Sequence, residues 1–278
     1  MSSSAREKAT LLRDLHYRDG PLVLVNAWDA VSARIVESLG FPAIATTSSG
    51  IANAEGYPDG QRISRRAMLS RVQVIARAVD IPVSADLEGG YGSTVDDAAA
   101  TARGAIESGA VGLNLEDGSG DATKPLLDPL LQAQRIRAIR IVGDDLGVPL
   151  VVNARVDSFH FGSDNEASFR DAAQRAAEYI RAGADCIFVP FVRDKDMIAR
   201  LAKAIAAPLN VLAGLETPDI ATLAQIGVRR VSVGGAPAGH AMAAFRDAAL
   251  ELRDRGTFAF AGQRLSHAEL NNLFAPTP

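Results

Sequence analysis

The chain has 278 residues, of which 47% are hydrophobic and 22% charged, so it is long enough for one large domain or two average ones. A formal net charge of −4 provides no basic surface for nucleic acid, and the single cysteine excludes an intrachain disulfide and a cysteine-based metal cluster. Since no apolar stretch has the length of a signal peptide or a membrane span, we expect a cytoplasmic protein that binds no membrane.

The predicted elements alternate between short apolar strands and helices along the chain. Each helix ends at a glycine or at an apolar-Pro-apolar step that opens the next strand, and the two kinds of junction alternate. Helical patterns are clearest over 30–39, 64–79 and 95–108. We expect strands within eight segments: 22–29, 37–48, 81–88, 107–117, 148–157, 181–191, 207–214 and 224–235.

Eight βα units with a period of about 30 residues are typical of the (β/α)8 or TIM barrel, an α/β fold with a parallel sheet. An open doubly wound sheet is the alternative. No GxGxxG follows the first strand, however, and no linker divides the chain into halves. We therefore predict a single barrel domain over 1–278.

The C-terminal region adds helix beyond the eighth strand. Segment 237–256 is predicted to be the last barrel helix, and 257–278 to be an extension with a short extra helix. Phe258, Phe260, Leu270 and Phe274 give the extension an apolar character, so we expect it to dock on the barrel or to be exchanged with a second subunit.

Polar residues gather at the predicted carboxyl ends of the strands, where barrel enzymes place their chemistry. Residues two apart on a strand share a face, and a strand buried on both sides has no solvated face for charge. A cap at the start of the next helix explains any one such residue equally well, but not pairs on three successive strands. These pairs are Asp86 with Glu88, Asn114 with Glu116, and Asn153 with Arg155 and Asp157.

Three acidic residues provide a set of hard oxygen ligands, and one arginine lies nearby. Such ligands suit Mg²⁺, or Mn²⁺, rather than zinc, and the presence of only four histidines agrees. The GGYG after Glu88 lets the backbone turn tightly and approach a ligand, although a plain flexible turn explains it as well.

Four motifs in register resemble the isocitrate lyase/phosphoenolpyruvate mutase superfamily. ADLEGGYG resembles the family's DADxGYG, GLNLED its xxxED, and NARVDSF its ARTDA. NAWDAVSARIVESLGF is similar to the opening xAxDxxSAxxxxxxGF, and the order agrees from about Leu22 to Phe245.

The resemblance implies a Mg²⁺-dependent barrel enzyme that forms a homo-oligomer, a dimer or tetramer, by exchanging a C-terminal helix. Family members act on small 2-oxo or 2-hydroxy acids through an enolate. By position, Asp86 would bind the metal directly, and Glu88 and Glu116 would act through water. Asp59 in GYPDG matches a further family acid.

The same resemblance implies the substrate-binding residues. Arg155 would contact the substrate carboxylate or the enolate oxygen as a catalytic residue. Ser48, Ser49 and Gly50 match the turn that holds the substrate carboxylate, and Asn210 a polar contact from the seventh strand.

The proton-transfer group is left open by the sequence. Lyases of the family carry a Cys and a His in the loop after the fourth strand, but GSGDATKPLLDP (118–129) has neither, and Cys186 lies in an apolar strand. Lys124 is the candidate in this loop, although a solvated loop lysine explains it too. The other candidates, each also explained by packing, are Tyr91, Tyr57 and His160.

The leading prediction is a Mg²⁺-dependent carbon–carbon lyase acting on a small 2-oxo or 2-hydroxy (di)carboxylic acid through a metal-stabilised enolate. P–C chemistry, as in phosphonopyruvate hydrolase or phosphoenolpyruvate mutase, is the second enzymatic possibility. A barrel that binds a 2-oxo acid without turning it over is the third, because the acid/base loop of the lyases is missing.

Overall fold

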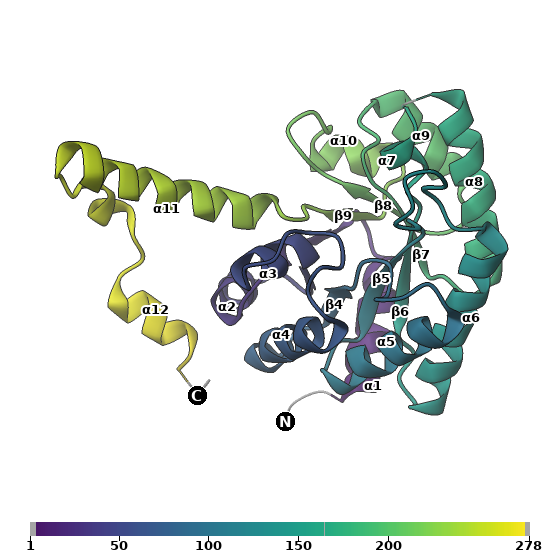
Figure 1. The fold of residues 1–278 in the computed structure, drawn as a ribbon, viewed down its shortest axis with the longest axis horizontal. Helices are drawn as coiled ribbons and strands as arrows, with labels where there is room; N and C mark the ends of the chain where they lie inside the picture. Colours follow the sequence, from purple (N-terminus) through teal and green to yellow (C-terminus); the bar gives the residue numbers. More distant parts are fainter. Residues whose placement is uncertain (1–3, 164, 276–278) are drawn as a thin grey trace.

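The computed structural model describes residues 4–163 and 165–275, so the last three residues of the predicted extension lie outside the described residues. Nine parallel strands form one sheet in the order β1-β9-β8-β7-β6-β5-β4-β3-β2 (Figure 1). β1 and β2 are two pieces of the single stretch 22–27, so the ring of paired strands closes through it. The predicted TIM-like (β/α)8 barrel is therefore confirmed.

Each of the eight predicted strand segments contains an observed strand, and the first segment is split in two. The strands are β1 Leu22–Leu24, β2 Asn26–Ala27, β3 Ile44–Thr46, β4 Val83–Asp86, β5 Gly112–Glu116, β6 Val151–Arg155, β7 Cys186–Val189, β8 Leu209–Leu212 and β9 Arg230–Ser232. The strands are short because each βα unit contributes only one strand to the wall of the barrel before the chain enters a loop.

Helices form the outer ring of the barrel. They are α2 Ala30–Ser38, α3 Ser48–Ala54, α4 Arg65–Ala78, α5 Val95–Glu107, α6 Pro129–Asp145, α7 Ser158–Phe161, α8 Glu166–Arg181, α9 Lys195–Ala204 and α10 Ile220–Gln225. Side chains that precede the helices accept the first free backbone N–H groups, as Asp29 does from Ser32 at 2.7 Å. No helix among the described residues is long and apolar enough to span a membrane.

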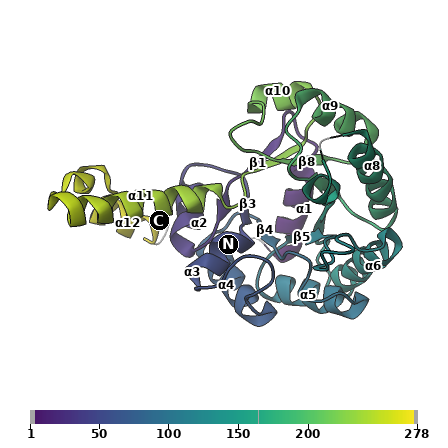
Figure 2. The same ribbon diagram turned by 45° about the horizontal axis from the view of Figure 1, so that its top comes forward.

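An N-terminal helix that the sequence analysis did not predict, α1 (Ala5–Leu15), closes the bottom of the barrel (Figure 2). Leu12 and Leu15 pack with Leu24, Val111 and Val151 at the amino ends of the strands. The contact with the neighbouring strand is tight, because a Cβ on Gly112 would lie 2.8 Å from Leu12 Cδ2.

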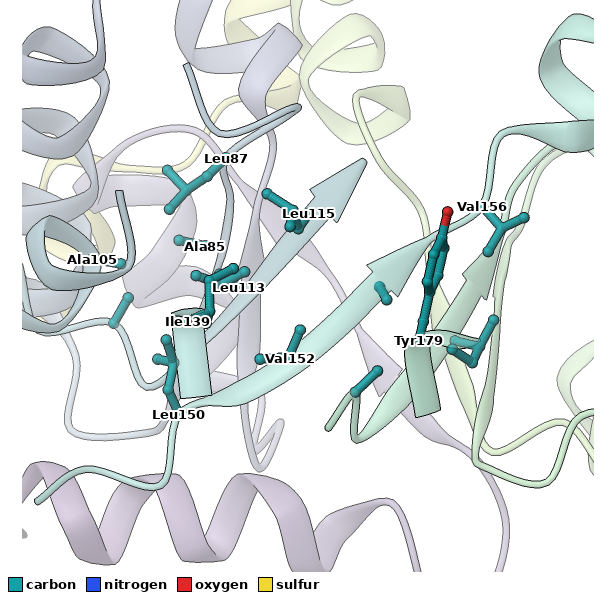
Figure 3. Close-up of a cluster of buried hydrophobic side chains, with 14 of the residues drawn as sticks. Ala85, Leu87, Ala105, Leu113, Leu115, Ile139, Leu150, Val152, Val156 and Tyr179 are labelled. Atoms are coloured by element: carbon teal, nitrogen blue, oxygen red, sulfur yellow. The ribbon is translucent and has the colours of Figure 1, made fainter. Parts of the chain in front are cut away.

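Alternation along the strands separates an apolar face from a polar interior. Ala85, Leu113 and Val152 point toward the helices and belong to the main hydrophobic core, which Figure 3 shows around Ile139 and Tyr179. Burying a Leu or Val side chain of this kind contributes about 1.5–3 kcal/mol. The residues between them carry the polar groups of the barrel interior.

Contacts across the barrel show that these polar side chains point into its interior. Arg230 on β9 donates to Ser84 on β4 at 3.2 Å, although the two strands are not neighbours. Asn153 donates to Asn114 at 2.7 Å, and Asn114 donates to Asp86 at 3.3 Å. The polar positions of β4, β5 and β6 therefore face the barrel axis, as the alternation predicted.

The last long helix differs from the prediction. α11 (Ala236–Arg255) leaves the barrel instead of packing along it, and a 3-10 turn at Ala259–Gln263 and α12 (His267–Leu273) follow outside the barrel (Figures 1 and 2). As a result, only Ala238 and Glu251 of this helix are buried. Met242 and Phe245 stay 56% and 73% exposed, so no apolar stripe of α11 is covered by its own barrel.

Candidate active site

A cavity of about 330 Å³ opens at the carboxyl ends of the barrel strands. Its lining residues come from the strands and from the loops and short helices that follow them, from Asn26 on β2 around the ring to Ser232 on β9. Parallel strands bring these ends to one edge of the barrel, where barrel enzymes place their catalytic residues. Seven of the residues predicted to bind the metal or the substrate line this cavity: Ser48, Ser49, Asp59, Asp86, Glu88, Glu116 and Arg155.

Asp86, the last residue of β4, is oriented by three donors. Its Oδ2 accepts hydrogen bonds from the backbone N and the hydroxyl of Ser48, at 3.0 and 2.8 Å. Its Oδ1 accepts from Asn114 on the next strand, and its own backbone N donates to Thr46. The carboxylate is therefore held in one position at the floor of the cavity before any ligand binds.

Glu88 reaches the cavity from outside the strand. β4 ends at Asp86, and Glu88 adopts a left-handed backbone with φ of 50°, so strand alternation does not explain its direction. Its carboxylate accepts hydrogen bonds from the backbone N of Gln61 and from the hydroxyl of Tyr91. Burial, with the nearby charges of Asp86 and Asp59, raises the pKa of Glu88 to about 7.

Glu116 and Arg155 face each other across β5 and β6 as register partners and form an ion pair. Arg155 also donates from Nε to Asp157 at 2.7 Å. Burial raises the pKa of Glu116, and Arg155 offsets this only in part. Burial opposes the charge of Arg155, but Glu116 and Asp157 outweigh it and raise the pKa of the guanidinium. Arg155 is therefore a permanent positive charge beside the carboxylates.

The glycine-rich turn after Glu88 is held by a residue that sequence reasoning missed. Arg135, fully buried on α6, donates to the carbonyl oxygens of Gly89 and Gly92. Gly90 adopts φ of 84°, which glycine accommodates at low cost. The only sequence signal for this role is an arginine on the apolar face of a predicted helix.

Two predicted substrate-binding residues lie beside the cavity rather than on its wall. Asn210 is fully buried on β8 and donates to Ser232, which does line the cavity. Gly50 is buried in α3, where an added Cβ would lie 2.6 Å from Thr47 Cγ2 and 3.1 Å from Trp28 Cβ. It therefore permits the close packing of the turn that presents Ser48 and Ser49.

The proton-transfer candidates differ in whether they line the cavity. Tyr91 donates its hydroxyl to Glu88 and is not a lining residue, and burial together with the Glu88 charge raises its pKa. Tyr57 and Lys124 are exposed on loops and do not line the cavity either. His160 on α7 does line it.

A buried network behind β5 was also missed by sequence reasoning. Asp117 accepts hydrogen bonds from Tyr179 at 2.7 Å, from Arg175 at 3.2 Å and from the backbone N of Asp157 at 2.9 Å. Burial and the nearby Asp157 raise the pKa of Asp117 to about 6. The network joins α8 to the strand ends that carry Glu116 and Arg155.

The donor set suits a hydrated divalent cation. Among the described residues, no group of three or more His, Cys, Asp or Glu side chains converges closely enough to enclose a metal ion. Mg²⁺, however, takes one or two carboxylates directly and keeps several waters, so it needs no such cage. Asp86, with Glu88, Glu116 and Asp59 around the same cavity, provides oxygen donors of this kind.

Known proteins resemble this chain in sequence and fold. The sequence profile of the phosphoenolpyruvate phosphomutase family matches residues 12–253. The chain belongs to this family. Since members of the phosphoenolpyruvate phosphomutase family belong to the superfamily that the four motifs resemble, the predicted relationship is confirmed.

One relative of this family member is an uncharacterised protein of Mycobacterium tuberculosis. The two sequences are 38% identical over 243 residues, which cover 87% of this chain and 88% of that protein. An oxaloacetate decarboxylase of a Bradyrhizobium species is 31% identical over 237 residues, 82% of this chain and 79% of the relative. The solved structure of a proposed lyase/mutase from Burkholderia cenocepacia, 39% identical, has a TM-score of 0.91 and covers 98% of this chain and 97% of its own. The predicted enzyme class, a carbon–carbon lyase, agrees with these relatives.

Proposed function

We propose that this protein is a Mg²⁺-dependent lyase that makes or breaks a C–C bond of a small 2-oxo or 2-hydroxy (di)carboxylic acid through an enolate. The observation that carries the proposal is the convergence of Asp86, Glu88, Glu116 and Arg155 on one cavity at the carboxyl ends of three neighbouring strands. An oxaloacetate decarboxylase among the relatives supports the reaction class.

The charge balance of the cavity supports the requirement for a cation. Four carboxylates line it against the single guanidinium of Arg155. An anionic acid would be repelled by this excess of negative charge. The pKa of Glu88 is raised first by burial and then by the charges of Asp86 and Asp59, which belong to the same group of carboxylates. Bound Mg²⁺, or Mn²⁺, would remove that repulsion and stabilise the charge that develops on an enolate oxygen.

Residues of the chain supply the remaining parts of the reaction. Ser48 and Ser49 lie on the cavity wall at the start of α3. The Ser48 hydroxyl already donates to Asp86, so Ser49 is the residue of this turn whose hydroxyl can turn to a substrate carboxylate. Arg155 is held by Glu116 and Asp157 with part of its guanidinium on the cavity wall, so it can donate to an oxygen that becomes negative. Preorganised donors of this kind stabilise the transition state more than the ground state.

Calorimetry with Mg²⁺ and oxalate, a mimic of a 2-oxo acid enolate, tests the site. The wild-type protein should bind oxalate only in the presence of Mg²⁺, and Asp86→Ala should lose both ligands. Asp121→Ala, in an exposed loop, is the matched control and should bind both normally. Unchanged Mg²⁺ affinity in Asp86→Ala would refute the assignment of this carboxylate.

Product analysis separates the possible reactions. Incubation with a panel of 2-oxo and 2-hydroxy acids, followed by proton NMR, should show C–C cleavage if the proposal is correct. The match to the phosphoenolpyruvate phosphomutase family favours P–C chemistry as the second candidate. Phosphorus NMR with phosphonopyruvate would detect it. Binding of oxalate without turnover of any acid would instead support a binding barrel.

We also propose that the protein is a homo-oligomer in which a second copy covers α11 and the C-terminal segment. Large apolar side chains on this segment lie in solvent when the chain is alone: Met242, Phe245, Phe258 and Phe274 are 52–73% exposed. Light scattering should give a dimer or tetramer, and Phe245→Asp should shift it toward the monomer. The cytoplasmic location stays a prediction.

A further inference from the structure

The proton-transfer group that the sequence leaves open can be sought among the residues on the cavity wall. The described lining residues include four carboxylates, Arg155 and one imidazole, that of His160. We propose that His160 is the catalytic acid/base that exchanges a proton with the carbon atom of the substrate enolate. This inference rests on the proposed lyase function.

The backbone places His160 close to the charged part of the site. α7 is a single helical turn that begins at Ser158, so two residues separate it from Arg155 at the end of β6. The backbone N of His160 donates to the carbonyl oxygen of Asp157 at 3.0 Å. Asp157 also accepts from Arg155, and its backbone N donates to buried Asp117. Arg155 and His160 are therefore positioned by the same anchored residue.

The imidazole ring is held by two phenylalanine rings. It stacks on Phe191, with 4.6 Å between the centroids and 27° between the planes. Phe161 meets it edge to face, with centroids 4.5 Å apart. These two contacts restrict the plane of the ring, although the residue is exposed at the cavity mouth.

The backbone of Phe191 adopts an unusual conformation. Its φ of 65° lies in the left-handed region, which is rare for a bulky residue and costs about 1–3 kcal/mol. This backbone places the ring on the cavity wall, where it contacts the imidazole and lies 5.9 Å from the Arg155 guanidinium. Strained residues of this kind cluster at active sites, where they position other groups.

The chemistry requires a group that can both give and take a proton near neutral pH. Imidazole does so because its ordinary pKa is about 6.5. Arg155 remains protonated, and its contacts with Glu116 and Asp157 hold it in place. Glu88, whose pKa is raised to about 7, lies with the other carboxylates around the proposed cation site, where a bound cation would keep them ionised as acceptors. His160 is the lining residue that carries an imidazole.

The step balances without any further reactant. In the cleavage direction, the C–C bond breaks and its electron pair stays on the departing carbon as the enolate. The other fragment leaves as CO2 when the substrate is a 2-oxo diacid. When the substrate is a 2-hydroxy acid, that fragment leaves as a carbonyl compound and its hydroxyl proton passes to a cavity carboxylate. The N–H bond of the His160 imidazolium then breaks, its proton forms the new C–H bond, and neutral imidazole remains. In the reverse direction, neutral imidazole removes the same proton from carbon and becomes imidazolium.

Hydrogen exchange of pyruvate measures this transfer without knowledge of the natural substrate. The wild-type protein with Mg²⁺ in D2O should replace the methyl protons of pyruvate by deuterium, observed by proton NMR. His160→Gln should lower the exchange rate by about 10²–10⁴-fold, the usual contribution of a general acid/base. Its affinity for oxalate and its melting temperature should stay at the wild-type values.

A matched control and the opposite outcomes make the test decisive. Lys203→Gln, on the exposed surface of α9, should exchange at the wild-type rate. Exchange by His160→Gln at the wild-type rate would overturn the role of His160 and leave the lyase proposal intact. A wild-type protein that binds oxalate but exchanges no pyruvate proton would overturn the acid/base role, and one that does neither would overturn the proposed function as well.

Discussion

Arg155 on β6 and Glu116 on β5 are direct partners in the strand register, and their side chains form an ion pair on the cavity wall. The same guanidinium donates to Asp157, which is almost fully buried. One positive charge thus balances two carboxylates in a poorly solvated place, and both stability and ligand binding depend on it.

Replacing Arg155 by Met should lower the free energy of unfolding by about 3–5 kcal/mol, because Glu116 and Asp157 would lose their counter-charge. Oxalate binding should be lost as well. Arg155→Lys keeps the positive charge but lacks the planar guanidinium with its fixed donors. It should therefore recover part of the unfolding free energy and little of the oxalate binding. Urea unfolding and calorimetry measure the two effects.

The control for this pair is Arg200→Met, which removes an exposed ion pair with Glu166. Such a pair contributes about 0–1 kcal/mol. If Arg155→Met were as stable as this control, the carboxylates beside it would not need its charge, and the electrostatic account of the cavity wall would be wrong.

Metal-free protein should become less stable as the pH rises from about 4.5 to about 7, in part because of Glu88. Burial first, then Asp86 and Asp59, raises the pKa of Glu88 from 4.5 to about 7. Within this window the folded protein holds a proton that the unfolded chain has released, so the free energy of unfolding falls with rising pH. Melting temperatures measured with a chelator present would show the slope.

Glu88→Gln should flatten part of that slope, whereas Glu166→Gln, on the exposed surface of α8, should leave it unchanged. Added Mg²⁺ should stabilise the wild-type protein most at the high end of the range, because ionised carboxylates bind the cation best. Equal slopes in the two variants would exclude Glu88 as a contributor.

Arg135→Met should loosen the turn at 89–92 and weaken oxalate binding without touching the cavity. The guanidinium donates to the carbonyl oxygens of Gly89 and Gly92, and its loss would leave them without these donors. We expect a loss of about 1–3 kcal/mol in unfolding free energy. Arg137→Met, on the exposed face of the same helix, is the matched control. Normal oxalate affinity in Arg135→Met would show that the turn does not depend on this arginine.

Tyr179→Phe should destabilise the protein by about 1–3 kcal/mol, because buried Asp117 would lose the hydroxyl donor at 2.7 Å. Since that hydroxyl also lowers the pKa of Asp117, its removal should raise this pKa above about 6. Chemical denaturation at pH 7 measures the loss. Tyr17→Phe, at an exposed position, should be neutral, and equal stability of the two variants would contradict the network.

The strands and the polar pairs on β5 and β6 could be predicted from sequence because their signals are local. Glycine and proline mark the helix-to-strand junctions within a few residues, and alternation directs Glu116 and Arg155 inward. Asp86 follows the same rule as the end of β4. Glu88 does not, because the chain has already turned at that point, yet it reaches the same cavity.

The supporting residues could not be predicted, because their partners are far away in the chain. Arg135 lies 46 residues from Gly89, and Tyr179 lies 62 residues from Asp117. No periodicity connects such positions. The direction of α11 is likewise invisible in its sequence, because a helix that is apolar on one side packs equally well on its own barrel or on another surface.

The sequence by itself determined the succession of eight βα units and the chemistry of the strand ends, because short-range steric preference and strand alternation encode both. The tertiary structure alone decided which side chains share one cavity. Closure of the ring brings His160 beside Phe191 and places both on that wall, while Lys124 and Tyr91 lie off it. Contacts between distant parts of the chain depend on how loops and layers pack, and no local pattern records that.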